Sequence, residues 1–195
     1  LAVDKDNNPF RNQNGSMLFR PGGHGALLNN LNELEADLIF IKNIDNVVPE
    51  KHLQTTVRFK KILAGKLLEV RDKVYSYLLK LESPEIGGNL LNEIYTYIRR
   101  ELCYEPQFTP DFGNKQSAVV FLKNILDRPL RICGVVRNLG EPGGGPYWAP
   151  NSSGDISLQI IESSQVNFTN SAQKEIFVRA THFNPVALVC CPMNY

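Results

Sequence analysis

The sequence predicts an α/β fold, and three observations indicate it. Residues 26–34 carry leucines at helical spacing and run directly into residues 37–41, a short apolar segment typical of a buried strand. A long block with helical periodicity follows between residues 49 and 127. Strand-like apolar segments return in the last third of the chain, at residues 130–136, 156–161 and 186–190. Helices combined with buried strands in this way are characteristic of α/β proteins.

The first 20 residues predict a hairpin. Short apolar pieces alternate there with turn residues, and Asn14-Gly15 lies between two such pieces. Both residues accept positive φ, which the tight turn of a hairpin requires. A chain that begins with a strand also suggests a piece of a longer protein, so we expect further sequence before residue 1.

Length, composition and charge limit the class of protein. With 195 residues and 43% hydrophobic composition, the chain can bury the core of one domain with a helical annex. The net charge is +1, so we expect neither a nucleic acid nor an anionic membrane as partner. No apolar run approaches the roughly 20 residues that span a bilayer, and we expect a soluble, cytoplasmic protein with a small partner. The four cysteines show no metal-binding spacing and are expected to be reduced and structural.

The helical block predicts three segments. Residues 49–81 form either one long amphipathic helix or two abutting ones, with Pro49 in the first turn. Further helices are expected at about 90–102 and 115–126, each followed by a proline-containing break. Basic side chains along the first segment are either a docking face or an ordinary solvated face, because acidic residues are interleaved with them.

Two stretches near the N-terminus indicate a nucleotide site. Arg20-Pro21-Gly22-Gly23-His24-Gly25 is a turn whose backbone N–H groups, beside a helix N-terminus, suit a phosphate or a base edge. Ile39–Asn46 is a strand that ends in amide and carboxylate side chains, and Asp45 lies where open α/β sheets place ligands and metals. The alternative for the glycine stretch is an ordinary tight turn with an exposed histidine.

These stretches resemble a known family. Pro21–Gly25 and Ile39–Asn46 are similar to the Pro-x-Gly-His-Gly motif and the strand ending in Asn-x-Asp-Asn of UDP-sugar pyrophosphorylases, UDP-glucose pyrophosphorylase in particular. Pro9-Phe10-Arg11 and Leu18-Phe19-Arg20 resemble still more closely a bacterial domain-of-unknown-function family related to those enzymes. The resemblance implies a Rossmann-like, glycosyltransferase-A-type mixed sheet. It divides the chain into a nucleotide-binding part (1–48), a helical insertion (49–128) and a sugar-binding, β-rich part (129–195) of the same α/β domain.

The resemblance also implies roles for the matching residues. Gly22, Gly23 and Gly25 would contact the nucleotide, with Gly23 against the uridine. His24 would lie near the phosphates and the sugar. Asn43 would contact the sugar, and Asp45 would bind the nucleotide and its Mg²⁺. His24 and Asp45 are therefore the expected catalytic residues.

A second pair of segments resembles the sugar-binding motifs of the same enzymes. Glu162-Ser163-Ser164-Gln165-Val166 matches Glu-x-x-Gln-Val, and Phe183-Asn184 begins Phe-Asn-x-Asn-Asn, from which Pro185 and Val186 depart. The resemblance implies that Glu162 and Asn184 contact sugar hydroxyls.

The glycine-rich stretch Gly140–Trp148 lacks the ending of a P-loop, which argues against an ATPase. It is either a mobile substrate loop, with Trp148 as a stacking surface, or a plain long turn.

The function that the resemblance implies is transfer of UMP from UTP to a sugar 1-phosphate, with a nucleotide and a sugar phosphate as partners and Mg²⁺ as cofactor. Two features of the family have no counterpart here: its N-terminal Gly-rich loop, with an arginine and a lysine for the triphosphate, and the lysine that follows the Phe-Asn motif. We expect them before residue 1 and after residue 195, respectively. Residues 1–195 alone are therefore expected to bind uridine nucleotides weakly and to turn over no substrate. The alternative is a non-catalytic module that binds a nucleotide sugar or a protein, with the helical block as its contact surface.

Overall fold

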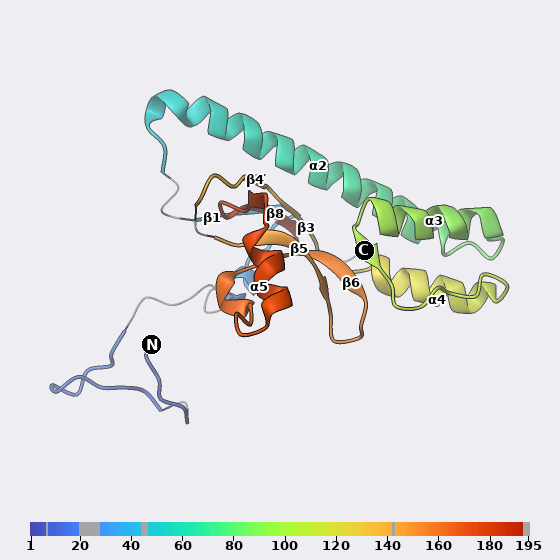
Figure 1. The fold of residues 1–195 in the computed structure, drawn as a ribbon. Helices are drawn as coiled ribbons and strands as arrows, with labels where there is room; N and C mark the ends of the chain where they lie inside the picture. Colours follow the sequence, from blue (N-terminus) through green and yellow to red (C-terminus); the bar gives the residue numbers. More distant parts are fainter. Residues whose placement is uncertain (7, 20–27, 44–46, 142, 193–195) are drawn as a thin grey trace. The chain divides into compact units, whose positions relative to one another are not determined.

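The structure is a computed structural model, and it describes residues 1–6, 8–19, 28–43, 47–141 and 143–192 (Figure 1). The contacts divide the chain into two units, Leu1–Ala36 and Asp37–Tyr195. The expected α/β class is confirmed at the level of a mixed α/β chain with small antiparallel sheets. Among the described residues, no helix is both long enough and apolar enough to cross a membrane.

The first unit contains the expected hairpin. Antiparallel bridges join Val3 to Pro9 and Arg11 to Met17. Gly15 has a φ of +80°, and its N–H donates to the Asn12 carbonyl over 2.9 Å, so the turn lies where the Asn-Gly pair predicts it. Helix α1 (Leu28–Asn32) falls within the expected helical segment 26–34, of which residues 26 and 27 lie outside the described chain.

The second unit is built on a three-stranded sheet in the order β1 (Ile39–Lys42), β8 (Ala187–Cys191), β3 (Leu130–Cys133). The central strand pairs antiparallel with both neighbours and places Ile39 and Arg131 opposite Cys190. Helix α2 (Leu53–Lys80) runs along this sheet (Figure 1). Its Leu67 packs with Val189 and Cys191 of β8, and all three side chains are buried.

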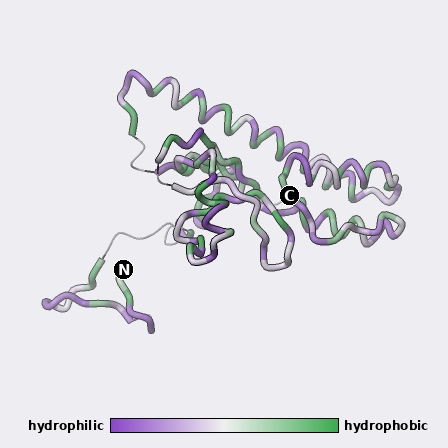
Figure 2. Tube along the Cα trace, in the orientation of Figure 1, coloured by the Kyte–Doolittle hydropathy of each residue, from purple (hydrophilic) through white to green (hydrophobic). Residues whose placement is uncertain are grey.

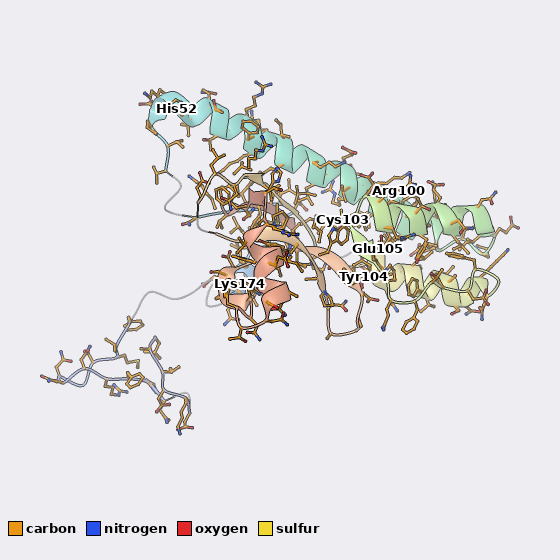
Figure 3. All side chains as sticks on the ribbon, in the orientation of Figure 1. His52, Arg100, Cys103, Tyr104, Glu105 and Lys174 are labelled. Atoms are coloured by element: carbon orange, nitrogen blue, oxygen red, sulfur yellow. The ribbon has the colours of Figure 1, made fainter. Side chains whose placement is uncertain are left out.

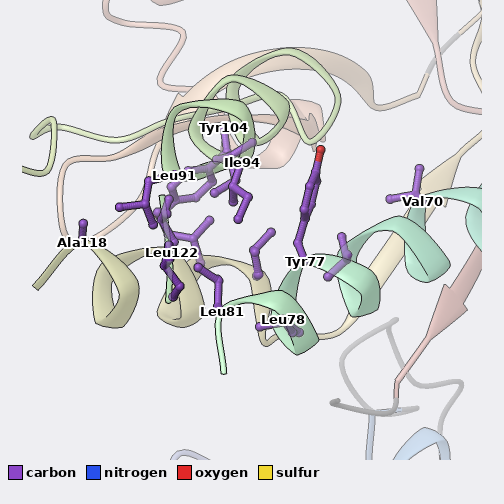
Figure 4. Close-up of a cluster of buried hydrophobic side chains, with 14 residues drawn as sticks. Val70, Tyr77, Leu78, Leu81, Leu91, Ile94, Tyr104, Ala118 and Leu122 are labelled. Atoms are coloured by element: carbon purple, nitrogen blue, oxygen red, sulfur yellow. The ribbon is translucent and has the colours of Figure 1, made fainter. Parts of the chain in front are cut away.

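The helical block forms as the periodicity predicts. A 3₁₀ turn, η2 (Glu50–His52), follows Pro49 and leads into α2, which is one continuous helix of 28 residues. Helix α3 (Gly88–Arg100) and helix α4 (Lys115–Leu126) complete it. Hydrophobic residues recur along all three helices (Figure 2). Their side chains meet in one core whose members include Tyr77, Leu91, Ile94 and Leu122 (Figure 4).

A second three-stranded sheet has the order β2 (Tyr104–Glu105), β6 (Ile156–Ile161), β5 (Gly145–Pro150). The Asp155 carboxylate at the turn between β5 and β6 accepts hydrogen bonds from the Tyr104 hydroxyl (2.6 Å) and the Gln107 N–H (2.9 Å), which joins the hairpin to the helical block. The remaining elements are the two-stranded sheet of β4 (Val136–Arg137) and β7 (His182–Phe183), a 3₁₀ turn η3 (Ser163–Gln165), and helix α5 (Ser171–Val178), which the sequence did not predict.

The strand pairing does not confirm the expected Rossmann-like, glycosyltransferase-A-type sheet. All strand pairs in the described part of the chain are antiparallel, whereas a Rossmann-like sheet is mostly parallel. The boundary between the two units falls after residue 36, and the three-part division at residues 48 and 128 stays a prediction. The observed sheet combines one strand from before the helical block with two from after it.

Candidate functional site

The predicted site residues fall into two groups. Gly22, Gly23, His24, Gly25 and Asp45 lie outside the described residues, and their roles stay predictions. Asn43, Glu162 and Asn184 are described. They come from segments far apart in the sequence, so their positions in space test whether the motifs share one region of the fold.

Asn43 and Asn184 meet at Val186. Asn43 follows the last residue of β1, and its backbone N–H donates to the Val186 carbonyl over 3.2 Å. The Asn184 side chain is buried, with 5% of the residue exposed. Its Oδ1 accepts from the Val186 N–H over 2.9 Å, and its Nδ2 donates to the Gly134 carbonyl. The buried amide therefore fixes the backbone that leads into β8.

Val186 itself has a strained backbone, with a φ of +53°. The left-handed region costs an L-residue about 1–2 kcal/mol, and a β-branched residue there is an outlier. The conformation persists because Asn43 and Asn184 bond both backbone groups of this residue. Strain held in this way is a common feature of functional sites.

Glu162 lies beside Gly144, which is hydrogen-bonded to Asn184. The Asn184 N–H donates to the Gly144 carbonyl over 2.7 Å. A Cβ atom at position 144 would lie 2.7 Å from Glu162 Oε1 and 2.9 Å from Ile160 Cγ2, so glycine at this position leaves room for the carboxylate where it now lies. Glu162 also forms a capping box at η3, in which its backbone N–H donates to Gln165 Oε1 over 2.9 Å.

The three described site residues are thus linked in one chain of contacts from Asn43 through Val186, Asn184 and Gly144 to Glu162. The neighbouring glycines provide close backbone packing within the protein. Cβ atoms at Gly143 and Gly145 would lie 3.3 Å from Phe183 Cδ2 and 3.1 Å from the His182 carbonyl, respectively. Neither a mobile loop nor a plain long turn describes all of Gly140–Trp148, because Gly145–Trp148 belong to strand β5, which pairs with β6.

A cavity of about 200 Å³ adjoins this region. Tyr147 and Phe177 form one side, with their rings stacked at 5.6 Å and an interplanar angle of 16°. The Tyr147 hydroxyl donates to the Phe177 carbonyl over 3.1 Å, and burial raises its pKa. The lining also includes polar residues that sequence reasoning did not assign to a sugar or nucleotide contact: Asn138, Glu141, Ser163 and His182.

Trp148, the expected stacking surface, is 54% exposed. It follows Tyr147 on β5, and successive side chains of a strand point to opposite faces. Trp148 therefore lies on the other face of the hairpin from the Tyr147 side of this cavity.

A larger cavity of about 380 Å³ lies apart from the predicted residues, between the end of α3, β3 and β6. Cys103 and Tyr104, which follow the end of α3 (Figure 3), are among its lining residues. Burial raises the pKa of the Cys103, Cys133 and Cys190 thiols, which favours their protonated form at neutral pH. No cluster of three or more metal-ligating side chains is found among the described residues.

Comparison with known proteins identifies a family. The family model described as "Domain of unknown function (DUF4301)" matches residues 1–195. No curated protein and no solved structure matches the chain.

Proposed function

The chain belongs to the family described as Domain of unknown function (DUF4301), and from this starting point we propose that it is a nucleotidyltransferase-like domain of the UDP-sugar pyrophosphorylase type. The reaction is transfer of UMP from UTP to a sugar 1-phosphate. A sugar-phosphate oxygen attacks the α-phosphorus in line, and pyrophosphate leaves. Nucleophile and leaving group are both anionic at neutral pH, so the protein needs to position and stabilise charge more than to move protons.

The observation that carries the proposal is the meeting of Asn43, Glu162 and Asn184. Motif resemblance selected these residues from three separate segments, and contacts through Val186 and Gly144 join them in one region. A shared binding site would account for the presence of these three motif residues in one region of the fold. The amide of Asn184 is held by its own backbone partners, so we assign it mainly a positioning role and assign sugar contact to Glu162 and Asn43.

The backbone of Val186 adds support. The resembling motif, Phe-Asn-x-Asn-Asn, has asparagine at the position that Val186 occupies in this chain. Asparagine visits the left-handed region far more readily than valine. The φ of +53° at Val186 is thus the conformation that the motif residue would favour.

The fold proposed with this function is a Rossmann-like, glycosyltransferase-A-type mixed sheet that contains β1, β8 and β3. Strand β1 ends at Lys42, and the sequence continues with Asn43, Ile44 and Asp45. Asp45 therefore follows the end of a strand closely, as ligand-binding residues of α/β sheets do. Mg²⁺ prefers carboxylate oxygen, so Asp45 would hold this ion, which when bound neutralises charge on the phosphoryl oxygens. Asn43 and Glu162 would bind and orient the sugar beside it.

The test is calorimetric titration of UDP-glucose into the wild type and Asp45→Ala, each with Mg²⁺ and with a chelator. The wild type is expected to bind more tightly with Mg²⁺, and Asp45→Ala is expected to lose that dependence while folding normally. Asp37→Ala, which removes an exposed carboxylate before β1 that has no proposed role, is the matched control. A mutant that keeps the wild-type metal dependence, or a wild type that binds no UDP-glucose, would overturn the proposal.

A second candidate function is a non-catalytic binding module on the same fold, with the helical block as contact surface. One observation favours it. The first half of α2 leaves four apolar side chains more than a third exposed, and these are Leu53, Val57, Phe59 and Ile62. Substituting Phe59 and Ile62 by serine should then weaken association with a protein partner and leave UDP-glucose binding unchanged, which separates the two candidates.

A further inference from the structure

The short β4–β7 sheet brings two basic side chains together. Its register pairs Val136 with Phe183 and Arg137 with His182. Residues directly opposite each other in an antiparallel pair project to the same face, with Cβ atoms about 4.5–5.5 Å apart. The Asn138 N–H donates to the Thr181 carbonyl over 3.0 Å and extends the pairing by one step. Arg137 and His182 are both exposed.

Neither side chain has an acidic partner in an ion pair of the described chain. The ion pairs found there leave out both Arg137 and His182. His182 Nδ1 lies 2.9 Å from the Thr181 hydroxyl, which fixes the ring and leaves Nε2 available to a ligand. An arginine beside a histidine, neither in an ion pair with any carboxylate that the structure describes, is suited to a phosphate, because the guanidinium offers two parallel N–H donors to its oxygens.

The cavity beside His182 has the character of a sugar site, and Arg137 lies outside its lining. His182 is one of its lining residues, together with Asn138, Glu141 and Ser163. The stacked Tyr147 and Phe177 rings supply an apolar side. Sugar hydroxyls can hydrogen-bond to the polar groups, while the Glu141 carboxylate disfavours a second anion inside. The charges therefore place a phosphate at the Arg137 side and neutral hydroxyls within the cavity.

We propose that Arg137 and His182 bind the phosphate group of a sugar phosphate whose ring enters the cavity of Glu141, Ser163 and Tyr147. The choice of a sugar rests on the proposed function, whereas the phosphate site rests on the β4–β7 pair itself. The site would hold the acceptor substrate, the sugar 1-phosphate, beside Glu162 and the glycine loop. The ligand class is a phosphorylated monosaccharide.

The test is titration of the full chain with glucose 1-phosphate, inorganic phosphate and glucose, followed by amide chemical shifts. We expect glucose 1-phosphate to bind most tightly and to shift residues of β4, β7 and the cavity. Arg137→Ala should weaken it at least about tenfold, because an N–H donor to a charged group is lost. Arg137→Lys should retain part of the affinity, and His182→Ala should weaken it less than Arg137→Ala.

Arg179→Ala is the matched control, because this arginine is exposed and is paired with Glu175 over 2.6 Å. Its affinity should equal that of the wild type. An unchanged affinity in Arg137→Ala, or an equal loss in Arg179→Ala, would overturn the phosphate site. Equal binding of glucose 1-phosphate and inorganic phosphate would overturn the sugar cavity. The two proposals can fail separately. If only the proposed function is wrong, Mg²⁺-dependent binding of UDP-glucose will be absent while phosphate binding persists.

Discussion

The helical block and the Val186 region of the same unit are stabilised in different ways. The helical core contains fourteen buried side chains from α2, α3, α4 and their connections, nearly all apolar (Figure 4). The sheet core beside it has three, Leu67, Val189 and Cys191. Around Val186, a buried asparagine and close glycine packing hold a strained backbone. Burial is non-directional and scales with the apolar area removed from water, whereas this hydrogen-bonded geometry depends on individual donor and acceptor atoms.

The largest effect is expected in the helical core. Ile94 is fully buried, so Ile94→Ala removes buried methyl groups and leaves a cavity. We expect a loss of about 3–4 kcal/mol in the free energy of unfolding, measured by urea denaturation. Val120→Ala on α4 is the control, since Val120 is 55% exposed, and it should cost well under about 1 kcal/mol. Similar losses in both variants would contradict the assignment of the core.

Asn184→Ala should cost about 2 kcal/mol although it removes little apolar surface. The change leaves the Gly134 carbonyl and the Val186 N–H without their side-chain partner in a buried position. Denaturation in urea measures the loss. Asn124→Ala, at an exposed position on α4, is the control and should be close to neutral. An unchanged stability in Asn184→Ala would show that the amide does not hold this backbone.

Tyr104→Phe should cost about 1.5 kcal/mol at pH 7, in a pH-dependent way. The Tyr104 hydroxyl, with the Gln107 N–H and the Ser153 and Asn151 side chains, holds the pKa of Asp155 well below its usual range. A depressed pKa adds stability above the unfolded value of about 4, and this stability is lost as the pH falls towards the folded pKa. The difference between wild type and mutant should therefore shrink in acid.

Tyr147→Phe is the control for this pH dependence. Its hydroxyl donates to the neutral Phe177 carbonyl, so its cost should be the same at neutral pH and in acid. Denaturation of both variants under the two conditions makes the comparison. A Tyr104→Phe cost that does not change with pH would remove the Asp155 interaction as its cause.

The smallest effect is a gain. Val186→Asn should raise the free energy of unfolding by about 1 kcal/mol, because asparagine accepts the left-handed conformation more readily than valine. Val135→Asn is the control, since Val135 is 41% exposed and is not among the residues with positive φ. A loss at position 186 equal to that at position 135 would show that packing of the valine outweighs its strain.

Local signals made part of the fold predictable. Helix α4 has the expected bounds, because Asn114 caps its start and Asp127-Arg128-Pro129 follows its end. Strand β6 also has the expected bounds. Helix α5 has no buried residues and therefore little apolar periodicity, so the sequence did not predict it. The antiparallel pairing of β8 with both β1 and β3 depends on distant residues and leaves no local signal.

The roles of the candidate site residues stay predictions, and the structure bears only on the positions of the described ones. Asn43, Glu162 and Asn184 came from the motif resemblance, but their meeting through Val186 and Gly144 depends on tertiary contacts. The sequence did not predict that Arg137 and His182 lie opposite each other in a sheet, because strands of two residues have no periodicity. Strand register sets this pairing, and register between distant segments cannot be derived from either segment alone.

The central position of β8 predicts an order of folding. This strand follows both of its partners in the sequence, and its register joins Cys190 to Ile39 and to Arg131. The helical block closes through shorter loops, so it can form first at a lower entropic cost. Substitutions in α3 and α4 should therefore change the folding rate, whereas those in β8 should change mainly the unfolding rate. Until β8 pairs, β1 and β3 are both unpaired edges, which makes the partly folded chain the form most open to aggregation.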